Sequence, residues 1–164
     1  VFPGLQGGPH DNVTAAKAIA LGEALEPSFK KYAHQVIVNA QFLAKKLQEK
    51  GYTIVSGGTD NHLMVIDLRP QQITGREAEI ALEKAGLSVS RSTIPGDSRP
   101  PFNPSGLRLG TAAVTTRGFK EQEMEQIANW FDQALNKRDS KPALAEIKQQ
   151  VSTLGRRLPP PQYN

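Results

Sequence analysis

The stretch that decides the fold is His62-Leu63-Met64-Val65-Ile66-Asp67-Leu68, in which five of seven residues are apolar. Apolar side chains here occupy neighbouring positions, so both faces of an extended strand would be apolar. This pattern is typical of a strand in the interior of its sheet. A turn cluster over residues 56–60 precedes it, and residues 52–55 read as a short strand before that turn. We therefore expect a sheet built around residues 62–68.

Two helices are predicted before these strands. Asn12 can cap a helix that runs to residue 25, and Pro27 can begin the next one. Six side chains of this second helix recur at spacings of three and four, which predicts one apolar stripe ended by Gly51. The stripe consists of Phe29, Tyr32, Val36, Ala40, Leu43 and Leu47.

Helices and strands alternate after residue 68. Thr74 and Glu77 form a capping box, and the helix that they start ends at Gly86. Strands are predicted at 87–90 and 107–109, and four prolines make residues 95–104 an irregular connection. The last predicted helices cover residues 119–135 and 141–154.

This order predicts an α/β fold, a small mixed or antiparallel sheet covered by helices on one side and preceded by two linking helices. We expect three parts. Residues 1–50 form a glycine-rich loop and helices that belong to the end of a larger domain, and residues 51–155 form a small α/β domain. Residues 156–164 form a loose, basic, proline-rich tail.

Composition narrows the functional classes. The 164 residues contain no cysteine, which excludes disulfides and thiolate chemistry, fits a reducing compartment, and leads us to expect a cytoplasmic protein. No apolar run approaches the length of a membrane span. The net charge is +4, but basic and acidic residues are interspersed along helix faces, which argues against a nucleic-acid partner. No pair of the three histidines has metal-ligand spacing.

Three constellations could carry chemistry, and each has a structural alternative. Adjacent Gly7 and Gly8 could expose amide N–H groups to a phosphate or form only a tight turn. Arg108, between two leucines and two glycines, could grip a carboxylate or lie on the wet face of a strand. The loop over residues 91–102 could bind a flat ligand or simply connect two elements.

Taken together, several motifs resemble those of the serine hydroxymethyltransferase family, in order and spacing, from residue 1 to about residue 135. The matching stretches are Val1-Phe2-Pro3-Gly4-Leu5-Gln6-Gly7-Gly8-Pro9-His10, Ser56-Gly57-Gly58-Thr59-Asp60-Asn61-His62-Leu63, Ile73-Thr74-Gly75-Arg76-Glu77-Ala78, Ser105-Gly106-Leu107-Arg108-Leu109-Gly110-Thr111 and Ala113-Val114-Thr115-Thr116-Arg117-Gly118.

The resemblance implies the C-terminal part of a fold-type I enzyme that uses pyridoxal 5'-phosphate. Such enzymes interconvert serine and tetrahydrofolate with glycine and methylenetetrahydrofolate. By resemblance, Arg108 grips the amino-acid carboxylate. Gly7 and Gly8 reach the cofactor phosphate of a neighbouring subunit, which implies a homodimer or a larger assembly. Ser92, Pro100, Pro101 and Phe102 match the folate site.

Some positions depart from the family pattern. Ser92 stands where many members have an asparagine that bonds the pterin, and Asn12 stands where a histidine is common. Pro100 replaces the usual serine, and Ala112 replaces the usual proline. These departures leave the folate contacts open. The family's Schiff-base lysine lies in an upstream Thr-Thr-His-Lys segment, which this chain does not contain. We therefore assign no catalytic residue here and expect the chain alone to lack transferase activity.

Four functional hypotheses follow. The first is a part of the enzyme, cut from a longer protein. The second is a non-catalytic truncated paralogue that acts as a binding or interaction domain. The third is a basic RNA-binding module, suggested only by the isoelectric point of about 9.4. The fourth is another fold-type I enzyme such as an aminotransferase, against which the folate-loop match argues.

Overall fold

The computed structural model describes residues 1–161, and the chain divides into two compact units, residues 1–34 and residues 35 onward. The division falls within helix α2 (Pro27–Glu49) rather than at the expected boundary at residue 50. The reason lies in the apolar stripe. Its second half, from Val36 to Leu47, is buried in the core of the second unit, whereas Phe29 is 45% exposed.

The first unit contains the glycine-rich loop and helix α1 (Asp11–Leu25). Helix α1 begins one residue before Asn12, and its N-cap position is held by His10, so the predicted cap by Asn12 is wrong. Helix α1 also has no buried face. No residue of α1 is buried, and Ile19 is 65% exposed.

The second unit is organised around a four-stranded antiparallel sheet in the order β1-β2-β4-β3. Strand β2 (Leu63–Asp67) lies inside the sheet, as its apolar sequence predicted, between β1 (Thr53–Ile54) and β4 (Gly106–Gly110). Five residue pairs join β2 to β4, from Leu63 opposite Gly110 to Asp67 opposite Gly106. The predicted small sheet is therefore confirmed, and all of its pairings are antiparallel.

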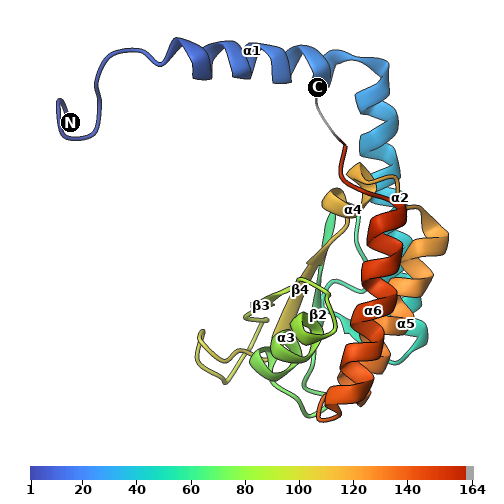
Figure 1. The fold of residues 1–164 in the computed structure, drawn as a ribbon. Helices are drawn as coiled ribbons and strands as arrows, with labels where there is room; N and C mark the ends of the chain where they lie inside the picture. The colour runs from blue at the N-terminus through green and yellow to red at the C-terminus, as the bar shows by residue number, and fades with distance from the viewer. Residues whose placement is uncertain (162–164) are drawn as a thin grey trace. The chain divides into compact units, whose positions relative to one another are not determined.

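Helices α2, α3 (Gly75–Lys84), α5 (Glu121–Asn136) and α6 (Lys141–Arg157) supply apolar side chains to one core with the sheet. In Figure 1, α3, α5 and α6 lie together beside the strands. The fully buried side chains include Leu47, Met64, Ile66, Leu82, Leu107, Met124, Phe131 and Leu144. Burying such a set removes several hundred square ångströms of apolar surface from water, which is the main stabilising term of the fold.

Local signals in the sequence explain where most elements begin and end. The Thr74 hydroxyl accepts from the Glu77 amide, and the Glu77 carboxylate accepts from the Thr74 amide, so the predicted capping box is confirmed. Gly51 and Gly86 have φ values of 88° and 83°, which ends α2 and α3 in the left-handed conformation.

A short helix, α4 (Ala112–Thr116), was not predicted. It is held by a buried polar network rather than by an apolar stripe. Asn39, fully buried in α2, donates to the Thr115 hydroxyl at 2.8 Å and to the Phe119 carbonyl at 2.9 Å. The Thr111 hydroxyl donates to the Val36 carbonyl, so the end of β4 and the whole of α4 are fastened to α2.

Two further predictions need correction. Strand β3 is Ser90–Ser92, not residues 87–90, because Leu87 and Val89 pack against the core while the polar residues after them pair with β4. Helix α6 continues to Arg157, so residues 156 and 157 do not belong to a loose tail. Residues 162–164 of that expected tail lie outside the described residues.

Candidate functional site

Strand β4 separates the core from an open face of the sheet. Leu107 and Leu109 point into the core, and alternation along the strand places Arg108 on the opposite face. Arg108 is exposed, and its Cα partners are Val65 on β2 and Ser90 on β3. Among the described residues, no hydrogen bond or ion pair involves its guanidinium. All of its N–H groups can therefore bind a ligand.

Glycines flank Arg108 on its own face of the strand. Gly106 and Gly110 lie two residues before and after it, and neither carries a side chain that could cover the guanidinium. At Gly106, a Cβ would lie only 2.5 Å from Ile94 Cγ2 and 2.8 Å from the Ser92 carbonyl oxygen. Glycine is therefore required there so that the chain after β3 can approach β4.

An open depression of about 420 Å³ surrounds the arginine. It is lined by His62, Leu63, Ser88, Val89, Ser90, Arg108, Leu109 and Gly110. No carboxylate belongs to this lining, so nothing there neutralises Arg108. A small anion such as an amino-acid carboxylate matches this combination of positive charge and free N–H donors.

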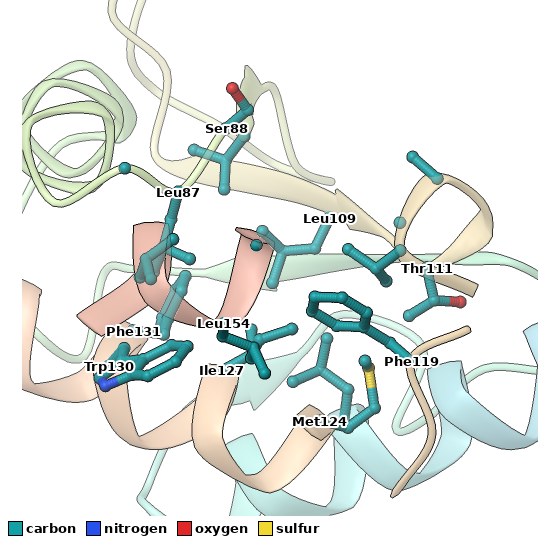
Figure 2. A pocket seen from close by; sticks show the side chains of 18 of the residues that line it. Leu87, Ser88, Leu109, Thr111, Phe119, Met124, Ile127, Trp130, Phe131 and Leu154 are labelled. Carbon is teal, nitrogen blue, oxygen red and sulfur yellow. The ribbon is translucent and has the colours of Figure 1, made fainter. Parts of the chain in front are cut away.

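A second, apolar pocket lies towards the core and is not this site. Figure 2 shows Leu109, Phe119, Met124, Ile127, Phe131 and Leu154 converging on it. Its volume is about 360 Å³, and its lining comes from helices α2, α5 and α6, the end of β4 with α4, and residues 86–89. Arg108 is not part of its lining. The one charged residue of its lining, Arg117, already donates to the Gly155 and Leu158 carbonyls.

The predicted loop between β3 and β4 is irregular, as its prolines indicated. Phe102 is 69% exposed at its tip, and Pro100 and Pro101 beside it are exposed as well. Arg91 supports this tip, because its Nη1 donates to the Phe102 carbonyl at 3.1 Å and its Nε pairs with Glu79 at 3.3 Å. Ser92 is half-buried, and its hydroxyl donates to the neighbouring Thr93 carbonyl.

A single carboxylate closes the base of the same loop. Asp97 accepts from the Ser105 amide at 2.9 Å, from the Ser105 hydroxyl at 2.7 Å and from the Arg99 amide at 3.0 Å. These hydrogen bonds, led by the one from the Ser105 amide, lower the pKa of Asp97 to about 2. The loop therefore leaves and re-enters the sheet at a fixed point.

The second predicted site lies in the first unit. Gly7 and Gly8 are exposed, and an added Cβ at either would meet no atom within 4 Å. Their amide N–H groups have no hydrogen-bond partner in the described part of the chain. Two free amides without side chains are suited to a phosphate. This loop belongs to the first unit and Arg108 to the second.

Other candidate chemistry finds no support within residues 1–161. No group of three or more His, Asp or Glu side chains is arranged to hold a metal ion. None of the helices in that range has both the length and the apolar character needed to cross a bilayer. No lysine lines the depression beside Arg108. The ammonium of Lys46 has a raised pKa because it hydrogen-bonds Glu125 and Glu49, which is the opposite of what a nucleophilic amine needs.

The second unit thus brings together some of the sequence-predicted residues. Ser92 lies opposite Gly106, two residues before Arg108, and the loop carrying Pro100, Pro101 and Phe102 joins these two strands. Sequence reasoning missed Asp97, Ser105 and Arg91, which hold that loop. A charged residue inside a proline-rich connection was the one available signal.

A family model described as serine hydroxymethyltransferase matches residues 1–131. Proteins named serine hydroxymethyltransferase from Coxiella burnetii, Alkalilimnicola ehrlichii and Desulfotalea psychrophila are 48%, 50% and 52% identical to this chain. The matches cover 97–98% of this chain but only 38% of the length of each relative. The chain therefore belongs to the serine hydroxymethyltransferase family, of which it represents the C-terminal portion.

Proposed function

We propose that this chain supplies the substrate-carboxylate clamp, part of the folate site and a phosphate contact to a serine hydroxymethyltransferase. The observation that carries the proposal is the free guanidinium of Arg108 on the open face of β4, between two glycines. The reaction is the transfer of the hydroxymethyl carbon between serine and tetrahydrofolate, with glycine as the other product. A cytoplasmic homodimer, or a larger assembly, belongs to the proposal on the family resemblance alone.

Arg108 binds and orients the amino acid. A guanidinium presents two parallel N–H donors to the two oxygens of a carboxylate, which fixes the rotation of the substrate as well as its position. Strand β4 is paired on both sides and packed through Leu107 and Leu109, so its backbone holds the base of this side chain rigidly. Holding the substrate in one orientation selects which bond at its α-carbon faces the cofactor.

The residues of the glycine loop fit the phosphate of pyridoxal phosphate. Gly7 and Gly8 offer unpaired amides and no steric barrier, and helix α1 begins three residues after Gly8. The N-terminus of a helix favours an anion. When bound, pyridoxal phosphate supplies the electron sink that the transfer needs. The role of the two glycines is to hold the phosphate of the cofactor. In the family, this cofactor is bound in the neighbouring subunit.

The loop over residues 91–102 provides a surface for the tetrahydrofolate co-substrate. Phe102 and Pro101 offer an exposed, rigid apolar surface that suits a flat ring system. Ser92, whose hydroxyl is bonded to Thr93, has a shorter reach than the asparagine of many family members. We therefore assign the pterin contact in this protein to the ring of Phe102 and the adjoining prolines more than to Ser92.

Residues 1–164 alone are expected to lack transferase activity, because no lysine stands beside Arg108. The test is to titrate this chain with pyridoxal phosphate, reduce with borohydride and map the labelled lysines. We expect scattered, substoichiometric labelling of exposed side chains. Stoichiometric labelling of one lysine would contradict the expectation and would favour a chain that carries its own cofactor site.

The decisive experiment replaces Arg108 by lysine in the full-length enzyme. One ammonium cannot reproduce the paired hydrogen bonds, and losing one charge-assisted bond of about 1.5–3 kcal/mol predicts a decrease in kcat/KM for serine of roughly 10- to 100-fold. Arg76→Lys, a change of the same kind at an exposed position of α3, is the matched control and should leave activity unchanged. Near-normal turnover by Arg108→Lys would show that the clamp is assigned wrongly.

A further inference from the structure

We propose that Asp97 is a positioning residue for the folate co-substrate, acting through Ser105 to hold the loop that presents Phe102. This inference rests on the proposed function, because it assumes that the loop between β3 and β4 forms part of the folate site. It adds to that function a residue that touches neither substrate nor cofactor. The same residue also ties the folate loop to the strand that carries the arginine.

Asp97 and Ser105 lie at different points of the loop between β3 and β4. Asp97 lies near the start of the loop, and Ser105 is its last residue, immediately before β4. Ser105 is 1% exposed, and its carbonyl accepts from the Leu68 amide at 2.9 Å, so it is fixed to the sheet. The bonds from Ser105 to Asp97 therefore fasten the first part of the loop to a residue that is fixed to the sheet.

The exposed tip of the loop lies between Asp97 and Ser105. Residues 98–104 are the span that the carboxylate closes, and Pro100, Pro101 and Phe102 stand at its centre. Other hydrogen bonds also hold this span, and the Gly75 amide donates to the carbonyl of the buried Pro104 at 2.7 Å. The Asn103 amide donates to the Pro100 carbonyl, and Arg91 donates to the Phe102 carbonyl. Without the closure by Asp97, the exposed ring of Phe102 would sample many orientations, and ligand binding would have to order it.

The hydrogen bonds at the base of the loop require a carboxylate at position 97. A carboxylate can accept several hydrogen bonds at once, and Asp97 accepts three, two of them from backbone amides. Its lowered pKa agrees with stabilisation of the anion by these donors. Asparagine has the same shape but only one acceptor oxygen. At this position its NH₂ group would face an N–H or O–H donor. Asp97→Asn therefore breaks hydrogen bonds at the base of the loop with minimal change in side-chain volume.

The test compares Asp97→Asn with Asp139→Asn in the full-length enzyme. Asp139 is an exposed carboxylate in the connection between α5 and α6, without a hydrogen bond in the described chain. We expect Asp97→Asn to raise the KM for tetrahydrofolate about tenfold, equivalent to about 1.4 kcal/mol, with kcat and the KM for serine within about twofold. Ser105→Ala, which removes one of the three donors, should give a smaller increase of about threefold. Asp139→Asn should change nothing.

A second measurement needs no activity. Amide hydrogen exchange in residues 1–164 should become faster at Ser105 and Arg99 in Asp97→Asn, while amides of β2 stay protected. Unchanged exchange at Ser105 would overturn the inference. So would an unchanged KM for tetrahydrofolate in Asp97→Asn when Phe102→Ala raises it. An unchanged KM in Phe102→Ala would instead show that the folate assignment of the loop is wrong, and this inference would fail with it.

Discussion

The two faces of strand β4 have opposite surroundings. Residues of the two faces alternate along its five positions. Leu107 and Leu109 are 0% and 9% exposed and pack into the core that four helices share with the sheet. Arg108 between them is exposed and has no partner among the described residues. One face therefore stabilises the fold, and the other presents a charge that the fold does not use. A rigid strand whose packing is complete on one side can hold a binding group on the other.

The largest effect is expected when the two faces are compared at adjacent residues. Leu107→Ala should lower the free energy of unfolding by about 2–5 kcal/mol, because it removes a fully buried side chain and leaves a cavity. Arg108→Ala should change it by less than about 0.5 kcal/mol, because an exposed side chain without partners contributes little. Urea unfolding of residues 1–164 measures both. Equal losses of stability in the two variants would show that Arg108 has a structural role.

The same division explains how much of the fold the sequence could predict. Signals that act within one or two turns were sufficient for several elements. Pro27 begins α2, Gly51 follows its end, and the Thr74–Glu77 box starts α3 as expected. The apolar stretch at 62–68 correctly indicated an internal strand. These features depend on local backbone preferences and on burial, both of which can be read along the chain.

Features that depend on distant partners could not be predicted in this way. Helix α4 has only five residues, too few for a periodic pattern, and it is held by Asn39 from another helix. Strand β3 begins at Ser90 because pairing with β4, not apolar character, sets its register. In α1, apolar residues occur all round the helix and stay exposed, so composition predicted a helix but not a buried face.

The same distinction between local signals and distant partners applies to the candidate site. Arg108 and the proline-rich loop stand out in the sequence because arginine between glycines and clustered prolines are uncommon patterns. Asp97 and Ser105 do not stand out, since their pairing spans eight residues and appears only when the loop is folded. Residues proposed to contact a ligand were therefore easier to find in the sequence than the residues that hold their loop in place.

The smallest expected effect is on the pH dependence of stability. The open side and the core side of the sheet are expected to respond in different pH ranges. Asp97 at the loop base and Asp67, which pairs with Arg69, have lowered pKa values, the first because of the Ser105 amide and the second because of the Arg69 side chain. Their contribution is complete above about pH 4, where both are ionised in the folded and unfolded chains. It is lost as the pH falls towards 2, where protonation ends these hydrogen bonds.

On the core side of the sheet, a buried tyrosine makes stability depend on pH in the alkaline range instead. Tyr52 is 5% exposed, and burial, together with the negative charge of Asp132, raises its pKa above the usual value of about 10. Its contribution is therefore complete below pH 10 and decreases above it, because the unfolded chain ionises first. Tyr52→Phe should flatten only the alkaline limb at a cost of about 1 kcal/mol for the lost bond to Asp132. Asp97→Asn should flatten only the acid limb, and thermal unfolding from pH 2 to 11 measures both. If either variant changed both limbs, the two faces of the sheet would not be energetically independent.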